Sequence, residues 1–206
     1  MKKKIILSIL VLIILLAFVF ILIKFFKFNK IYIGMNENYK ITNFHYIRES
    51  NSIRYDITRN DNIIILKTYS YTDDSLIHTF TFYTNGSENY VFNETDKTYN
   101  TSEQDEIGSL KSLYTSLEFD NIDLNLIEKI KMFFNTSIEK VSQNGIDCYH
   151  ITRNFTNNNS TYDFYIDTNN YLVVLSNNET CIDYQLNSIT SEDIVMPNLE
   201  EYQLVQ

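Results

Sequence analysis

The stretch that decides the fold covers residues 144–186 and reads NGIDCYHITRNFTNNNSTYDFYIDTNNYLVVLSNNETCIDYQL. Apolar and polar residues alternate in it, as they do in strands that bury one face. Asn-rich turns separate the alternating segments, and each turn is too short to contain a crossover helix. Neighbouring strands must therefore run antiparallel, as a meander. Two of the apolar faces that this alternation predicts are Tyr162, Phe164 and Ile166, and Ile182, Tyr184 and Leu186.

The same alternation predicts strands on both sides of a central segment. Asn85-Gly86 indicates a tight hairpin, because a type I′ turn needs positive φ at both of its central residues. The expected strands cover residues 52–58, 63–71, 76–83, 88–92, a short segment from Thr98, 138–142, 146–153, 161–166, 171–175 and 180–187.

Between these two groups of strands, the apolar residues recur every three or four positions, which is typical of amphipathic helices. A first helix is expected around Ile107, Leu110, Leu113 and Leu117, and a second one at residues 123–134. Their apolar faces must be buried, and the apolar face of the sheet is available to cover them. The chain is therefore expected to have an α+β fold of roughly nine strands with two helices inserted mid-chain and packed on one face of the sheet.

The N-terminus differs sharply from the rest of the chain. Residues 5–23 carry no charge, and seventeen of these nineteen residues are Ile, Leu, Val or Phe. As a helix they would reach about 28 Å, close to the roughly 30 Å of a bilayer's hydrocarbon core. The run is longer than a secretory signal requires and lacks a small-residue cleavage pattern, which favours an uncleaved anchor. We expect an anchor at residues 1–30 and a body at residues 31–206.

The charge distribution follows the same division. The first 30 residues hold six lysines and no acid, so the body carries all 26 acidic residues against eleven Lys and Arg. Lysines flank the apolar run on both sides, so the positive-inside rule is nearly balanced. The N-terminus resembles an export signal, which favours a single-pass protein of the cell membrane with an extracytoplasmic body; a tethered cytoplasmic domain is the alternative. A body this acidic, without a basic run, argues against nucleic-acid binding.

Several segments resemble one family. Residues 80–100 read FTFYTNGSENYVFNETDKTYN, residues 144–154 read NGIDCYHITRN, and residues 160–175 read STYDFYIDTNNYLVVL. Together with the closing EDIVMPNL at residues 192–199, this order of features resembles the LolA/LppX-like superfamily of lipoprotein carriers, as an anchored relative from a single-membrane bacterium. The resemblance covers residues 40–202.

The resemblance implies a curved, unclosed half-barrel whose concave face holds acyl chains in an apolar cavity beneath helices. Two features depart from the family. Its members have an amphipathic helix before the first strand, whereas residues 31–42 here look too short for one, and a carrier would be soluble rather than anchored. No ligand-contacting residue of the family can be placed by motif, so the fold transfers better than the function.

The candidate lining of such a cavity consists of apolar residues from four expected strands and from the second helix. In the simpler interpretation, these residues are ordinary core. They are Phe80, Phe82, Ile127, Ile130, Phe134, Tyr162, Phe164, Ile166, Tyr184 and Leu186.

No motif predicts catalysis, a metal or a cofactor. His45, His78 and His150 lie in separate segments without a closely spaced carboxylate partner, so structural roles are expected for them. Cys148 and Cys181 could form a disulfide in an oxidising compartment. In a simple meander, however, two strands would separate them by about 14 Å, beyond the roughly 7 Å that a disulfide allows between Cα atoms.

The sequence therefore favours a non-enzymatic, membrane-anchored binding protein that holds a lipid or lipoprotein acyl chain. The alternative is an interaction module with a solid core, which docks a neighbouring envelope protein through an exposed edge strand.

Overall fold

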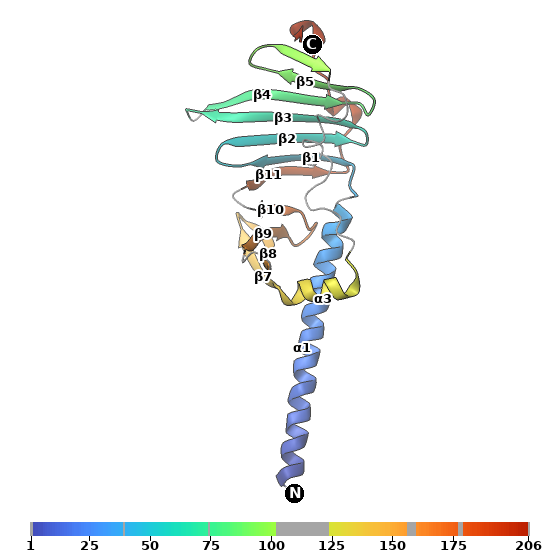
Figure 1. Cartoon of the computed structure of the whole chain (residues 1–206), viewed down its shortest axis with the longest axis vertical. Coiled ribbons are helices and arrows are strands. Elements are labelled where there is room, and N and C mark those ends of the chain that lie inside the picture. The colour runs from blue at the N-terminus through green and yellow to red at the C-terminus, as the bar shows by residue number, and fades with distance from the viewer. Residues whose placement is uncertain are drawn as a thin grey trace.

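The computed structural model describes residues 2–38, 40–73, 75–101, 124–155, 160–176 and 179–205. A long N-terminal helix leads into one large, unclosed sheet of twelve strands, and a short helix crosses the long one where it meets the sheet (Figure 1). The helices are α1 (Lys2–Asn38) and α3 (Leu126–Phe134). The strands are β1 (Asn43–Glu49), β2 (Ile53–Asn60), β3 (Ile63–Thr72), β4 (Ser75–Thr84), β5 (Asn89–Asn93), β6 (Thr98–Thr101), β7 (Thr136–Gln143), β8 (Ile146–Phe155), β9 (Ser160–Asp167), β10 (Val173–Ser176), β11 (Glu179–Leu186) and β12 (Gln203–Leu204).

The strand order is β12-β6-β5-β4-β3-β2-β1-β11-β10-β9-β8-β7. The chain thus starts in the middle of the sheet, runs outward as a meander to β6, restarts at the opposite edge with β7 and meanders back until β11 pairs with β1. Every pair is antiparallel except β12 with β6, which is parallel. The predicted antiparallel meanders are confirmed on both sides.

The expected number of strands was too low, because β1 and β12 were missed. β1 carries large side chains on both faces: Phe44 and Tyr46 are buried on one, and His45 and Ile47 are half-buried on the other. A central strand covered on both faces lacks a clean polar alternation, so its signal is weak. β12, which pairs with Thr98 and Tyr99, has only two residues, too few to show an alternation in the sequence.

α1 is longer than the anchor expected at residues 1–30, because residues 31–38 continue it as one helix. Its last turns pack on the sheet, where Ile31 joins a buried cluster with Ile151, Phe164 and Ile166. We call this side of the sheet the helix face; it also carries Phe44. The earlier residues of α1, Ile5 to Ile23, are exposed, and α1 is long and apolar enough to cross a membrane.

α3 begins at an N-cap, Asn125, whose side-chain oxygen accepts hydrogen bonds from the backbone N–H groups of Ile127 and Glu128 at 3.0 Å. In return, the backbone N–H of Asn125 donates to the Glu128 carboxylate, which completes a capping box. These contacts explain why the helix starts a few residues after position 123. The other expected helix, around Ile107 to Leu117, lies outside the described residues.

The expectation that α3 packs its apolar residues onto the concave face of the sheet is wrong. No residue of α3 is buried, and Ile127, Ile130 and Phe134 are 66%, 39% and 70% exposed. The Phe133 ring does pack inward, edge-on against the Phe25 and Phe28 rings of α1 at 5.4 and 5.7 Å between centroids. The physical reason is that the end of α1 already occupies the sheet surface beside β8 and β9.

The opposite side of the sheet, which we call the tail face, is partly covered by the C-terminal tail, residues 187–205. Ile189 and Ile194 form a buried cluster with Ile65 of β3. Further along, the Tyr202 ring packs edge-on against Phe92 of β5 at 4.9 Å between centroids. The tail thereby buries apolar side chains on the far half of the sheet and ends beside β6 as β12.

At Gly34, α1 passes close to the side chain of Tyr171. A Cβ atom at this position would overlap the ring of Tyr171, which precedes β10 and packs against the cluster around Ile31. Tyr171 is itself in the left-handed region, with φ of 60°, which is unusual for a bulky residue.

We therefore expect Gly34→Ala to destabilise the body. Overpacking costs about 1–3 kcal/mol, which outweighs the roughly 1 kcal/mol that alanine gains over glycine inside a helix. Thermal unfolding of the full chain in detergent, followed by circular dichroism, measures the net effect. Ile33→Ala is the control, since Ile33 is an exposed neighbour on the same helix. A higher midpoint for Gly34→Ala would show that α1 does not dock here.

Candidate binding face

The helix face holds two buried apolar clusters side by side. The first surrounds Phe44, Tyr46 and Leu66 at the centre of the sheet. The second joins Ile31 of α1 to Phe164 and neighbouring residues of β8, β9 and β10. The Tyr46 hydroxyl donates to the Val173 carbonyl at 3.1 Å, across the boundary between the two clusters. This hydrogen bond joins the two clusters, and the end of α1 covers the second one.

The structure distributes the ten candidate lining residues over three places. Phe82, Tyr184 and Leu186 pack on the first cluster, and Phe164 and Ile166 belong to the second. Phe80 and Tyr162 are exposed. Phe80 lies two residues before Phe82 on the same, helix face of β4, and Tyr162 lies opposite Arg153. The three α3 residues, Ile127, Ile130 and Phe134, are exposed and belong to neither cluster. The ten residues thus do not line a single cavity under α3, because the α3 side chains point away from the clusters.

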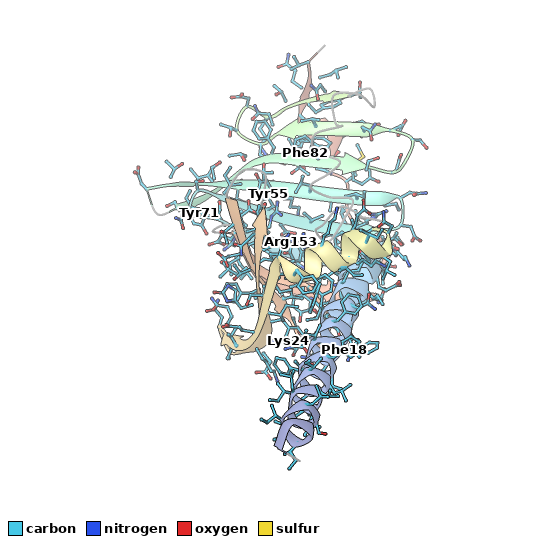
Figure 2. The ribbon with its side chains drawn as sticks, turned by 60° about the horizontal axis from the view of Figure 1, so that its bottom comes forward. Phe18, Lys24, Tyr55, Tyr71, Phe82 and Arg153 are labelled. Carbon is cyan, nitrogen blue, oxygen red and sulfur yellow. The ribbon has the colours of Figure 1, made fainter. Side chains whose placement is uncertain are left out.

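Arg153 of β8 is the cation that stands out on this face. Its guanidinium lies 5.9 Å from the centre of the Phe164 ring, and burial lowers its pKa. Its Nε atom is shielded from solvent and has no hydrogen-bond partner among the described residues. Figure 2 shows Arg153 beside α3, where the helices and strands come together. A buried donor without an acceptor is costly, so an acceptor that reached this Nε would be stabilised there.

Asp167, at the end of β9, connects α1 to the sheet through a polar network. It is buried, and its carboxylate accepts hydrogen bonds from the Tyr184 hydroxyl at 2.9 Å and from the backbone N–H of Asn169 at 2.7 Å. Asn170 donates to the Tyr184 oxygen at 2.7 Å, and its carbonyl accepts a bond from Asn38, the last residue of α1, at 2.8 Å. This network fixes the end of the helix over β9 and β11.

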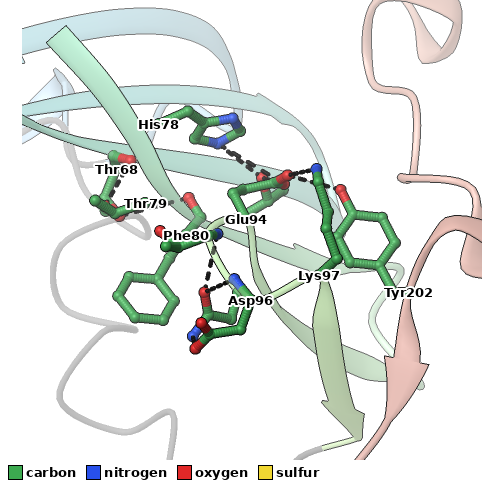
Figure 3. A network of polar contacts seen from close by, with 11 residues as sticks. Thr68, His78, Thr79, Phe80, Glu94, Asp96, Lys97 and Tyr202 are labelled. Carbon is green, nitrogen blue, oxygen red and sulfur yellow. Dashed lines mark hydrogen bonds and ion pairs between the residues drawn. The ribbon is translucent and has the colours of Figure 1, made fainter.

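A second polar network surrounds Glu94, after β5, and holds the C-terminal tail (Figure 3). One carboxylate oxygen of Glu94 accepts from the Thr81 hydroxyl at 2.7 Å. The other accepts from the Tyr202 hydroxyl at 2.7 Å and from the Lys97 ammonium at 2.9 Å. His78 approaches the first oxygen at 4.0 Å and stacks on Tyr69. The donors of Thr81, Tyr202 and Lys97 converge on this one carboxylate, and His78 contacts the Thr81 hydroxyl at 2.9 Å, so the cluster has a structural role.

Glu94 should make the stability of the tail dependent on pH. Burial raises the pKa of this carboxyl group. The hydrogen bonds from Lys97, Thr81 and Tyr202 lower it by more than burial raises it, so the net pKa falls below the ordinary 4.5. The folded chain therefore keeps Glu94 ionised to a lower pH than the unfolded chain does. The resulting stabilisation is fully present above pH 4.5 and is lost as the pH falls through the lowered pKa.

We expect Glu94→Gln to reduce the free energy of unfolding at neutral pH by about 1–3 kcal/mol and to flatten its dependence on acid. The measurement is a series of thermal melts between neutral and acidic pH. Glu88→Gln serves as the control, because Glu88 is an exposed carboxylate of the β4–β5 turn. Parallel pH curves for the wild type and Glu94→Gln would contradict the assignment.

The folded sheet places a carboxylate near each histidine, across strands rather than close in the sequence. His45 lies 3.0 Å from Asp56 and His150 lies 3.1 Å from Asp163, in both cases on a neighbouring strand. The hydrogen bond with Asp56 is the main cause that raises the pKa of His45. Strand pairing produced these contacts, which sequence spacing alone could not reveal. In the described part of the chain, no three His, Cys, Asp or Glu side chains are arranged to hold a metal ion.

No disulfide joins Cys148 and Cys181 in this structure. Cys148 lies in β8 and Cys181 in β11, and β9 and β10 lie between them. Two intervening strands at about 4.8 Å each keep the thiols too far apart to bond. Burial raises the pKa of the Cys148 thiol, which makes it a poor nucleophile.

The protein is thus an unclosed, mostly antiparallel sheet preceded by an N-terminal apolar helix. No protein-family model matches this chain, and no curated protein matches it.

Proposed function

We propose that this chain is a membrane-tethered, extracytoplasmic binding protein that holds a lipid or another acyl-chain amphiphile on its helix face. Residues 5–23 of α1 would be the tether, and the sheet would be the binding body. The proposal agrees with the resemblance to lipoprotein carriers, but it rests on residues of this chain. An amphiphile needs an apolar surface for its chain and a positive group for an anionic head.

Arg153 is the observation that carries the proposal. Its shielded Nε lacks a protein acceptor in the described residues, while its guanidinium lies over the Phe164 ring of the second apolar cluster. Tyr162, opposite Arg153 in the β8–β9 ladder, is 40% exposed. A carboxylate or phosphate head that entered beside the guanidinium would give Nε the acceptor it lacks, and the acyl chain would lie along the exposed Tyr162 side chain.

The test uses the full chain in detergent and a radiolabelled palmitate probe. We expect saturable binding that weakens about 10–100-fold in Arg153→Met, since a hydrogen bond to a charged group contributes about 1.5–3 kcal/mol. Arg54→Met is the control, because Arg54 pairs with Glu49 on the opposite, tail face. Native mass spectrometry of the wild type should also show a bound lipid. Equal palmitate affinity in both variants would refute the assignment of Arg153.

The second candidate function is an interaction module with a solid core. It is favoured by the dense packing of both clusters, in which Leu66 and Ile166 have no exposed surface. β7 lies at one edge of the sheet and, among the described strands, pairs with β8 alone, so it offers backbone groups to a partner strand. Crosslinking in cells from a photoreactive residue at Ser137, which is exposed on β7, would test this function. A protein adduct from this position, together with a lipid-free native mass, would favour the module over the lipid-binding protein.

A further inference from the structure

α3 carries an apolar face that the described part of the chain leaves uncovered. Leu126, Ile127, Ile130 and Phe134 are all exposed. At 3.6 residues per turn, these four positions fall within about 100° of the helix circumference. Phe133, which contacts the Phe25 and Phe28 rings, lies beside this arc rather than within it. α3 is thus attached to α1 by one side and presents an apolar stripe on another.

The position of α3 along α1 indicates what covers this stripe. Phe133 contacts α1 at Phe25 and Phe28, which lie two and five residues beyond Ile23, the end of the uncharged run. At about 1.5 Å per residue, this places the contact roughly 3–8 Å beyond the membrane-spanning segment. Interfacial helices lie with their apolar faces about 5–10 Å into the boundary between headgroups and acyl chains. α3 also runs across α1 rather than along it (Figures 1 and 2).

The charges at this level complement an anionic surface. Lys24, Lys27 and Lys30 of α1 and Lys131 of α3 are exposed around the junction of the two helices. The acid of α3, Glu128, turns back to bond the N–H of Asn125 and lies away from the apolar stripe. Lysines beside an apolar stripe are the composition of helices that lie on membranes containing anionic lipids.

We propose that α3 lies in the interfacial layer of the membrane, with Leu126, Ile127, Ile130 and Phe134 inserted between lipid headgroups and the neighbouring lysines facing their phosphates. This inference rests on the proposed tether α1. The tether fixes the height of the body above the bilayer, and α3 fixes its orientation by adding a second contact. The helix face near Arg153 is then held close to the lipid surface, from which an amphiphile could enter.

The absence of Trp from the chain allows a direct test. The full chain is reconstituted in nanodiscs of phosphatidylcholine and phosphatidylglycerol, in which a fraction of the phosphatidylcholine carries brominated acyl chains that quench Trp fluorescence at short range. Single Trp residues are introduced at three exposed positions: Phe134→Trp on α3, Phe20→Trp within the tether, and Val195→Trp beside Ile194, which packs on β3 far from α1. Ile127→Trp is the second α3 probe, for use if Phe134→Trp does not fold.

We expect Phe134→Trp and Phe20→Trp to lose most of their emission in brominated nanodiscs, and Val195→Trp to lose almost none. Quenching of Phe20→Trp without quenching of either α3 probe would overturn the inference while leaving the tether intact, and would point to a protein partner on the stripe. No quenching of Phe20→Trp would instead overturn the tether. Omitting phosphatidylglycerol should reduce the quenching of Phe134→Trp only, and equal quenching without this lipid would remove the role of the lysines.

Discussion

Replacement of Phe44 by alanine is expected to lower the free energy of unfolding by about 3–5 kcal/mol, which is the usual cost of truncating a buried phenylalanine. Phe44 is 1% exposed and lies in β1, the strand that joins the two meanders. Its ring packs in the central cluster with Tyr46, Ile57 and Leu66. A cavity at this position would loosen the pairing of β1 with both β2 and β11.

Denaturant unfolding of the full chain in detergent, followed by circular dichroism of the sheet, measures this loss. Phe80→Ala is the matched control, because Phe80 carries the same side chain on the same face of the sheet but is 40% exposed. We expect the control to lose about 1 kcal/mol. Similar losses in the two variants would mean that the cluster around Phe44 is not the main core of the sheet.

Replacement of Asp167 by alanine is expected to cost about 2–4 kcal/mol and to release the end of α1 from the sheet. Its buried carboxylate accepts hydrogen bonds from the Tyr184 hydroxyl and the backbone N–H of Asn169. Removing the acceptor leaves these donors unsatisfied, and bonds to charged groups contribute about 1.5–3 kcal/mol each. Asn38 would lose its support from Asn170 as the turn relaxes.

Hydrogen exchange measured by mass spectrometry distinguishes this local release from general unfolding. Residues 31–38 and the turn after β9 should lose protection in Asp167→Ala, while β2 to β4 should keep theirs. Asp163→Ala is the control, since Asp163 lies on the same strand but is exposed. If exchange increases equally throughout the sheet, Asp167 does not act through the α1 contact.

Much of the fold could be predicted because the strands with one solvated face alternate clearly. β2, β3, β4, β8, β9 and β11 begin and end within about two residues of the expected positions. β1 could not be found in this way, because neighbours cover both of its faces. The position of α1 over the sheet was also missed, since the anchor was expected at residues 1–30 and residues 31–42 looked too short for a helix before the first strand. Helix formation instead continues to Asn38, because Ile31 and Met35 find a partner surface on β8 to β10.

The candidate site was predictable only in part. Phe82, Phe164 and Ile166 do contribute to the helix face, because their alternation determines which side they take. The polar residues of the site, Asp167 and Arg153, gave no signal of their own, since a polar residue in or next to a strand is normally solvated. The amphipathic pattern of α3 identified a helix correctly, but an apolar stripe does not specify whether protein or lipid covers it.

The central place of β1 has a consequence for biosynthesis. Asn43, at its start, hydrogen-bonds Ile189, 146 residues later in the chain. Ribosomes therefore complete β2 to β6 long before the C-terminal meander exists, and one edge of β1 has no partner strand during that interval. Unpaired edges recruit other chains, and contacts between distant segments form slowly. A nascent chain stalled before β11 should thus be prone to aggregation unless a chaperone shields that edge.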